Sequence, residues 1–157
     1  MIFTDSINGV DLEIEAGVVK SIQDLAKASY PNESGGFLVG NYSSDMKRAV
    51  VKEMIIPEKF ISTPVSFQRD TVGMNKVWED LFNNGLIYLG EWHSHPNGTA
   101  FYSNTDKRAV INIAESDSVT IANPIMVIFS LNEDEIKEIR AYYYRKGEII
   151  EYEQYRY

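Results

Sequence analysis

The only two histidines of the chain, His93 and His95, lie two residues apart. Side chains at positions i and i+2 of an extended strand project to the same side, so both imidazoles can reach one ion. Imidazole nitrogens bind zinc at about 2.0–2.1 Å, and a catalytic zinc takes three protein ligands and keeps one position for water. The spacing therefore predicts a metal site whose third ligand comes from another segment, with a chance surface pair as the simpler alternative.

Asp106 is the candidate for the third ligand. Residues 96–102 can turn the chain back, so that the start of a following helix would face the histidines. Ser103 and Asp106 also have the spacing of a helix-capping pair, and capping alone would account for both side chains. The resulting hypothesis is a site of two imidazoles, one carboxylate and an open water position.

Amide hydrolysis at such a site also requires a group that moves a proton. Zinc lowers the pKa of its bound water toward neutrality and polarises a carbonyl, but the proton must still be carried between the water and the leaving group. Glu33, in a turn ahead of an apolar strand, and Glu91, shortly before the histidines, are the candidate carboxylates. Their spacing does not choose between them, and a solvated loop carboxylate is the simpler explanation of Glu33.

Apolar patterning predicts the elements that would position these side chains. Apolar runs rich in Val and Ile are typical of strands, and apolar residues at intervals of three and four are typical of helices. We expect strands at residues 10–14, 36–40, 48–56, 86–89 with a continuation into the histidines, 124–131, 135–145 and 148–152. We expect helices at residues 16–29, 74–82 and 103–114. Together they predict an α+β fold, a single domain over residues 1–157 with a mixed β-sheet flanked by about three helices.

Three local expectations accompany this outline. Residues 57–64 are predicted to form a loop. Asp70 is predicted to be the N-cap of the second helix. Trp78 and Trp92 flank apolar runs, which favours core positions for both rings.

Composition excludes several classes of function. The 15 Lys and Arg residues stand against 23 Asp and Glu residues, and the net charge of −8 disfavours nucleic acid and anionic membranes as partners. The absence of cysteine excludes disulfide frameworks, thiolate metal sites and thiol nucleophiles. The first residues lack the pattern of a signal peptide, and no apolar run is long enough to span a bilayer, so a cytoplasmic protein is expected.

The candidate residues resemble those of a known family. His93-Ser94-His95-Pro96, six further residues and Ser103-Asn104-Thr105-Asp106 match the His-x-His-Pro-x6-Ser-x-x-Asp signature of the JAMM metallopeptidases, the catalytic members of the MPN-domain family. The run Glu33-Ser34-Gly35-Gly36 resembles the segment that carries the upstream glutamate of that family. The resemblance covers roughly residues 10–150 and implies the JAB/MPN fold, which is cytidine-deaminase-like.

This resemblance implies a role for each motif residue. The implied ligands of a Zn²⁺ ion are the two imidazoles and the carboxylate of the signature, His93, His95 and Asp106. Glu33, rather than Glu91, is implied to act as general acid and base on the bound water. Ser103 is implied to stabilise the tetrahedral oxyanion, and a donor of this kind contributes a few kcal/mol to lowering the barrier.

A narrower resemblance concerns the prokaryotic JAB branch of the family. The compact chain, residues 62–70 and residues 90–93 are most similar to the deconjugating peptidases encoded with ubiquitin-transfer-like enzymes in bacterial antiphage (CBASS) operons. The implied reaction is hydrolysis of the isopeptide or peptide bond after the C-terminal glycine of a ubiquitin-like protein conjugate. Two alternatives remain open: a non-catalytic assembly or binding subunit of the same fold, and a hydrolase of a sulfur-carrier adduct or a small-molecule amide.

Overall fold

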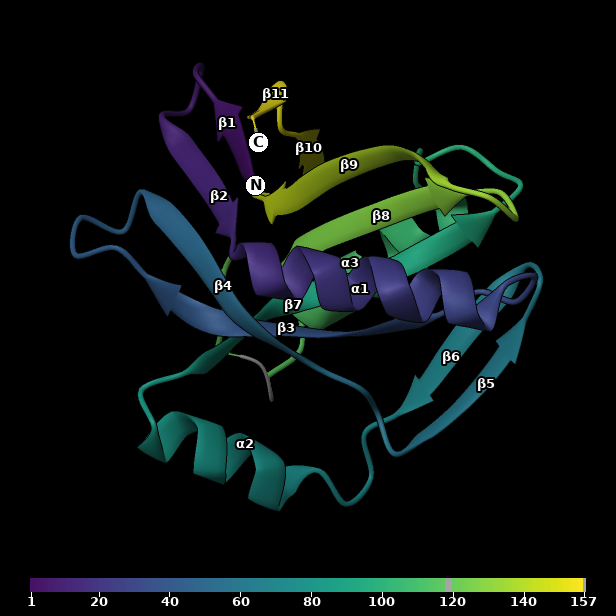
Figure 1. Ribbon diagram of the computed structural model, residues 1–157. Coiled ribbons are helices and arrows are strands. Elements are labelled where there is room, and N and C mark those ends of the chain that lie inside the picture. The colour runs from purple at the N-terminus through teal and green to yellow at the C-terminus, as the bar shows by residue number, and fades with distance from the viewer. Residues whose placement is uncertain (118–119, 157) are drawn as a thin grey trace.

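The computed structural model describes residues 1–117 and 120–156, which form one mixed β-sheet, three helices and a separate β-hairpin (Figure 1). The sheet contains β1 (Ile2–Asp5), β2 (Val10–Ile14), β3 (Gly35–Tyr42), β4 (Arg48–Ile55), β7 (Ile87–Pro96), β8 (Ile125–Leu131), β9 (Ile136–Arg145), β10 (Glu148–Glu151) and β11 (Gln154–Arg156). The helices are α1 (Ala16–Ser29), α2 (Asn75–Asn83) and α3 (Asn104–Ala114), and the hairpin pairs β5 (Lys59–Thr63) with β6 (Ser66–Asp70). The predicted α+β fold with a mixed sheet and three helices is confirmed.

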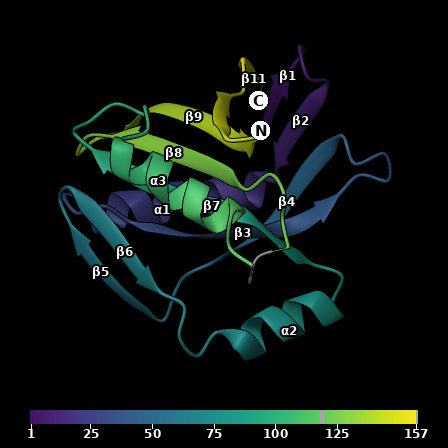
Figure 2. The same cartoon turned by 180° about the vertical axis from the view of Figure 1, so that it is seen from behind.

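The strands of the large sheet follow the order β10-β9-β8-β7-β3-β4-β2-β1-β11. Neighbours are antiparallel except for two parallel pairs, β2 with β4 and β7 with β8. A parallel pair needs a crossover connection, and α3 supplies it between β7 and β8. In the two opposite views, α1 covers one side of the sheet and α3 the other (Figures 1 and 2).

The two ends of the sheet meet at a seam. Tyr152 donates its backbone N–H to the oxygen of Ala141 in β9 over 3.0 Å, and Glu153 donates to the oxygen of Thr4 in β1 over 2.8 Å. The short link between β10 and β11 therefore joins both ends of the sheet. The pattern analysis missed β1 and β11, because strands of four and three residues are too short to show a period.

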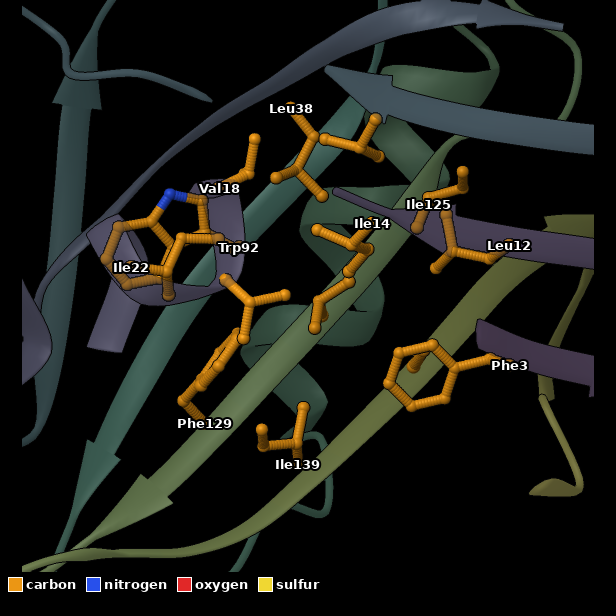
Figure 3. Packing of buried hydrophobic residues seen from close by; sticks show 14 of the residues in the cluster. Phe3, Leu12, Ile14, Val18, Ile22, Leu38, Trp92, Ile125, Phe129 and Ile139 are labelled. Carbon is orange, nitrogen blue, oxygen red and sulfur yellow. The ribbon is translucent and has the colours of Figure 1, made fainter. Parts of the chain in front are cut away.

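The main core lies between α1 and the sheet. Helix α1 buries Val18, Val19, Ile22 and Ala26 at helical spacing. Figure 3 shows Val18 and Ile22 beside Trp92, whose ring lies edge-on to Phe129 with centroids 6.1 Å apart. Trp92 is 1% exposed, which confirms its predicted core position and fixes the strand that carries both histidines.

Trp78 differs from the prediction, because it is only half-buried and belongs to no core cluster of the described residues. Its ring contacts Phe37 and Tyr88 edge-on, with centroids 5.1 and 6.0 Å away. The described structure of α2 contains no buried residue at all. Trp78 is therefore the anchor of a surface helix, and its apolar neighbours in the sequence gave a core-like pattern.

The predicted loop at residues 57–64 was wrong in part. Residues 59–63 form β5, and its partner β6 begins at Ser66 after two intervening residues. The side chains of β5 are exposed or half-buried, so the segment lacks the apolar alternation that marks a half-buried strand. The rings of Phe60 and Phe67 lie 5.4 Å apart and tie the two strands together.

Asp70 does not cap α2, which is a second correction. The helix begins at Asn75 after Met74, and no side chain caps it. Asp70 Oδ1 instead accepts the backbone N–H of Val72 over 2.9 Å, which is a local turn contact ahead of the helix. None of the helices in the two described ranges is long and apolar enough to cross a lipid bilayer.

Candidate metal centre

Strand β7 places the two histidines on one face of the sheet. It pairs with β3 on one side and with β8 on the other, so its backbone is held along both edges. Trp92 and Ser94 point into the protein, whereas His93 and His95 alternate with them and keep 14% and 15% of their side chains exposed. The predicted same-side projection of the imidazoles is observed.

The first turn of α3 brings Asp106 to the same place. Ser103 is the N-cap: its Oγ accepts the N–H of Asp106 over 3.1 Å, while Asp106 Oδ2 accepts the N–H of Ser103 over 2.7 Å. This capping box fixes the carboxylate so that its oxygens lie 3.4 Å from His93 Nε2 and 3.6 Å from His95 Nε2. The capping explanation is thus correct, and the same carboxylate also faces the histidines.

The spacing of the three groups fits a metal ion. The two Nε2 atoms lie 3.0 Å apart, and the two distances to the carboxylate oxygens are 3.4 and 3.6 Å. Ligands bound tetrahedrally at 2.0–2.1 Å lie about 3.3 Å from one another, which falls within this range. The donor set of two imidazoles and one carboxylate leaves a fourth position for water.

The second ring nitrogen of His95 supports the same arrangement. His95 Nδ1 lies 2.8 Å from the backbone oxygen of Thr99, and because a carbonyl can only accept, Nδ1 carries the proton. With Nδ1 protonated, Nε2 of the neutral ring is the atom free to bind a cation, and Nε2 of the charged ring donates to Asp106 instead. The contact of Nδ1 with Thr99 is the outer contact that orients metal-binding imidazoles.

Asp106 stays ionised at neutral pH. Burial opposes its charge, but hydrogen bonds with His93 and His95, the positive potential of His93 and a hydrogen bond from Ser103 outweigh that penalty. They hold the pKa of Asp106 well below its usual range. Burial likewise lowers the pKa of His95, and the contacts with Asp106 and Thr99 outweigh it and raise that pKa. A permanently ionised carboxylate between two imidazoles is suited to a divalent cation.

Glu33 reaches the histidine face through the pairing of β3 with β7. Gly35 lies opposite His93 in this antiparallel pair. The contact continues one residue further, because Ser94 donates its N–H to the oxygen of Ser34 over 2.8 Å. Side chains alternate along an extended chain, so Glu33, two residues before Gly35, lies on the face of His93.

The pKa of Glu33 responds to the charges of the three clustered residues. Burial raises the pKa of Glu33, the positive potential of His93 and His95 lowers it, and the charge of Asp106 raises it again, with a net upward shift. The structure thus brings together the four titratable residues predicted from the signature.

Glu91, the other candidate carboxylate, forms an ion pair with Arg69 of β6. Its Oε1 accepts Arg69 Nε over 2.7 Å, with a second bond from Nη2 of the same guanidinium, and Tyr88 donates its hydroxyl over 3.3 Å. The carboxylate therefore ties β7 to the hairpin, although Glu91 lies on the same face of the strand as His93. Sequence spacing alone gave no sign of this ion pair.

Ser34 and Ser94 are two further residues that the sequence analysis did not single out. Both are buried, the Ser94 Oγ accepts the N–H of Ser34 over 2.8 Å, and the two hydroxyls lie 3.1 Å apart. The position of Ser94 between the histidines was the signal available for it. Next to this pair, a Cβ on Gly35 would lie 2.7 Å from the ring of Phe67, which explains why the motif carries a glycine here.

The raised pKa of Glu33 predicts a pH-dependent change in stability. In metal-free protein the folded state binds the Glu33 proton more tightly than the unfolded state, so the ionised carboxylate lowers stability above its folded pKa. Glu33→Gln removes this charge and is expected to raise the melting temperature at about pH 8 and to change it less at about pH 4. Thermal unfolding of both proteins in chelator measures the difference. An equal shift at both pH values would contradict the assigned burial of charge.

A comparison with known families identifies the family of this chain. The model of the prokaryotic homologues of the JAB domain matches residues 15–142, well over half of the chain. The chain belongs to the prokaryotic JAB family.

Two curated relatives of this JAB protein have names that point to peptide-bond chemistry. A CD-NTase/cGAS isopeptidase of Enterobacter hormaechei subsp. hoffmannii is 35% identical over 112 residues, which are 71% of this chain and 62% of the relative. A probable metalloprotease of Sinorhizobium fredii is 29% identical over 125 residues, 73% of either chain. This chain therefore spans less than two thirds of the first relative. The cluster of His93, His95 and Asp106 in this chain could hold a metal ion.

Solved structures agree on the fold of this JAB protein. A solution structure of a Desulfitobacterium hafniense protein is similar with a TM-score of 0.68 and 22% identity, covering 89% of this chain and 88% of the other. A JAB1/MPN domain protein from Archaeoglobus fulgidus gives a TM-score of 0.51 at 21% identity, covering 90% and 95%. The predicted JAB/MPN fold is confirmed.

Proposed function

We propose that the chain is a zinc-dependent isopeptidase that hydrolyses the bond after the C-terminal glycine of a ubiquitin-like protein conjugate. The observation that carries the proposal is the triangle of His93, His95 and Asp106 ligand atoms, with Glu33 on the same face. The relative named an isopeptidase supports the type of bond. The resemblance of residues 62–70 and 90–93 extends the proposal to a conjugate made by a ubiquitin-transfer-like system of antiphage defence, and the sequence pattern extends it to the cytoplasm.

In the proposed reaction Zn²⁺ is held by His93, His95 and Asp106, and when bound it polarises the scissile carbonyl and acidifies a water. Glu33 accepts the proton of the attacking water and delivers it to the leaving lysine amine. Burial raises the pKa of Glu33, and a more basic carboxylate accepts the proton of the water more readily. Burial of Glu33 is thus a functional feature in this proposal.

Ser103 is proposed to donate a hydrogen bond to the carbonyl oxygen as it becomes an oxyanion. Its Oγ accepts the N–H of Asp106, and its hydroxyl also bonds the Asp106 carboxylate and lowers the pKa of that group. A hydroxyl hydrogen rotates about the C–O bond, so it can turn from the carboxylate to a substrate oxygen. The hydroxyl can therefore cap α3 as an acceptor and serve the substrate as a donor at the same time.

Ser103→Ala is expected to lower kcat by about 10²–10³-fold, as for other single oxyanion donors. The same change removes the helix cap and should lower the free energy of unfolding by about 1 kcal/mol. Ser103→Thr keeps the hydroxyl and is the matched control. Steady-state kinetics and urea unfolding measure the two effects separately, and a Ser103→Ala protein with full activity but lower stability would leave Ser103 only its capping role.

The function is tested with a panel of substrates for the purified chain. A Gly-Gly-lysine isopeptide between ubiquitin and a peptide, a linear fusion through the same glycine, ordinary peptides and a small-molecule amide are compared, with Glu33→Gln as the inactive control. We expect the glycine-terminated conjugates to be cleaved in preference to the rest. Equal rates on all substrates would favour a general amide hydrolase, and metal-free protein without turnover would favour the assembly-subunit alternative.

A further inference from the structure

The hairpin β5–β6 lies outside the large sheet, yet it holds the backbone of Glu33 on both sides. Glu33 donates its N–H to the oxygen of Thr63 over 2.8 Å, and Ser62 Oγ donates to the oxygen of Glu33 over 2.5 Å. We propose that the hairpin positions Glu33 for proton transfer and that Ser62 is a positioning residue for the hydrolysis. This inference rests on the proposed role of Glu33 as general base.

Glu33 needs such support because the main sheet does not supply it. The pairing of β3 with β7 ends at Gly35, and the last contact with β7 is made by Ser34. The N–H and the carbonyl of Glu33 lie beyond that ladder, and both go to the hairpin. The two hairpin contacts therefore fix the position of the Glu33 backbone, from which the side chain extends toward the site.

The hairpin is itself attached to the strand that carries the histidines. Arg69 of β6 bonds Glu91 of β7, in a contact where the two side chains are 26% and 21% exposed. The Arg69 guanidinium also lies 5.6 Å from the centre of the Phe37 ring. On the same hairpin, the Phe67 ring covers Gly35. Glu33 is thus held in a fixed relation to the metal ligands through the hairpin.

The outer side of the hairpin is free in this structure. Ile61 is 64% and Val65 is 85% exposed, on the same short element that holds Glu33 through Ser62 and Thr63. A displacement of the hairpin is therefore expected to move Glu33 without moving the histidines, because the histidines belong to the doubly paired strand β7. The expected sign of a weakened hairpin contact is lower kcat with metal binding unchanged.

Ser62→Ala tests this expectation, with Ser66→Ala as the matched control. Ser66 lies on the same hairpin and its hydroxyl lies 2.8 Å from Thr63 Oγ1, but it does not bond Glu33. We expect Ser62→Ala to lower kcat about tenfold, the effect of one lost hydrogen bond in the transition state, with KM and metal content unchanged. Ser62→Thr should restore kcat, and Ser66→Ala should resemble the wild type.

Hydrogen exchange of the Glu33 amide gives a second readout that does not depend on substrate. Loss of the Ser62 contact should speed exchange in residues 30–36 of Ser62→Ala but not of Ser66→Ala. If the wild type cleaves conjugates and Ser62→Ala matches Ser66→Ala in kcat, the positioning role is overturned and the proposed function stands. If the wild type cleaves nothing, the proposed function fails, and unchanged exchange in Ser62→Ala overturns the hairpin contact independently.

Discussion

Glu33→Gln is expected to bind metal like the wild type and to hydrolyse conjugates about 10²–10⁴-fold more slowly, the usual contribution of a general base. Glutamine has nearly the same shape but cannot accept a proton. The three proposed ligands are untouched, so metal content should stay the same. Metal analysis and single-turnover kinetics on the same preparation separate the two properties.

The dependence of the wild-type kcat on pH should reflect the ionisation of Glu33. Glu33 can accept a proton only when it is ionised, so the rate should rise with pH as this carboxylate loses its proton. Burial raises the pKa of Glu33, and a bound cation would lower it. The rate is lost as the pH falls, because the protonated carboxyl cannot accept the proton of water. Kinetics of kcat against pH measure this acid limb.

Glu91→Gln is the matched control for Glu33→Gln. It removes a carboxylate from the same face of β7, where Glu91 bonds Arg69. We expect a loss of stability and a smaller loss of activity in the folded protein. An inactive Glu91→Gln beside an active Glu33→Gln would reverse the assignment and restore the alternative that sequence spacing left open.

His95→Ala is expected to abolish both metal binding and hydrolysis. Protein purified without added metal or chelator should contain about one zinc per chain, the content of a single three-ligand site, and the variant almost none. His95 is one corner of the triangle, with its Nε2 3.0 Å from His93 Nε2. A site with only one imidazole and one carboxylate left cannot hold the ion at purification concentrations.

Asn104→Ala serves as the control, because Asn104 is exposed and lies beside Ser103 without being a proposed ligand. Chelator should lower the melting temperature of the wild type and of Asn104→Ala, since an ion bound only to the folded state stabilises it. It should leave His95→Ala unchanged. A His95→Ala protein that keeps its zinc would contradict the ligand assignment, and a wild type that takes up no zinc would favour an assembly subunit.

The local parts of the site were predictable from the residues themselves. The two histidines of β7 follow from alternation along a strand, and Asp106 follows from the spacing of a capping box at the start of α3. The three lie close in the chain, so short-range geometry decides their arrangement. The same holds for α1, whose predicted bounds at residues 16–29 are observed.

The long-range parts were not predictable in this way. Glu33 joins the site because Gly35 pairs with His93, and no local pattern specifies the register of two strands so far apart in the chain. The resemblance to a family, rather than the spacing, favoured Glu33 over Glu91. The hairpin was missed because the side chains of β5 are exposed or half-buried and show no apolar pattern. The prediction of Asp70 as a helix cap was wrong because aspartate is equally common in turns, and Asp70 accepts the N–H of Val72 in such a turn.

His93, His95 and Asp106 lie close together in the chain, so the proposed metal ligands can come together earlier in folding than Glu33 can join them. Only residues 93–106 must close on themselves to assemble the ligands, and closing a short loop has a small entropic cost. Glu33 joins them only when β3 pairs with β7, across a separation of sixty positions in the Ser34–Ser94 contact. A partly folded chain could thus bind the proposed ion before Glu33 is in place, whereas the proposed hydrolysis requires the finished fold.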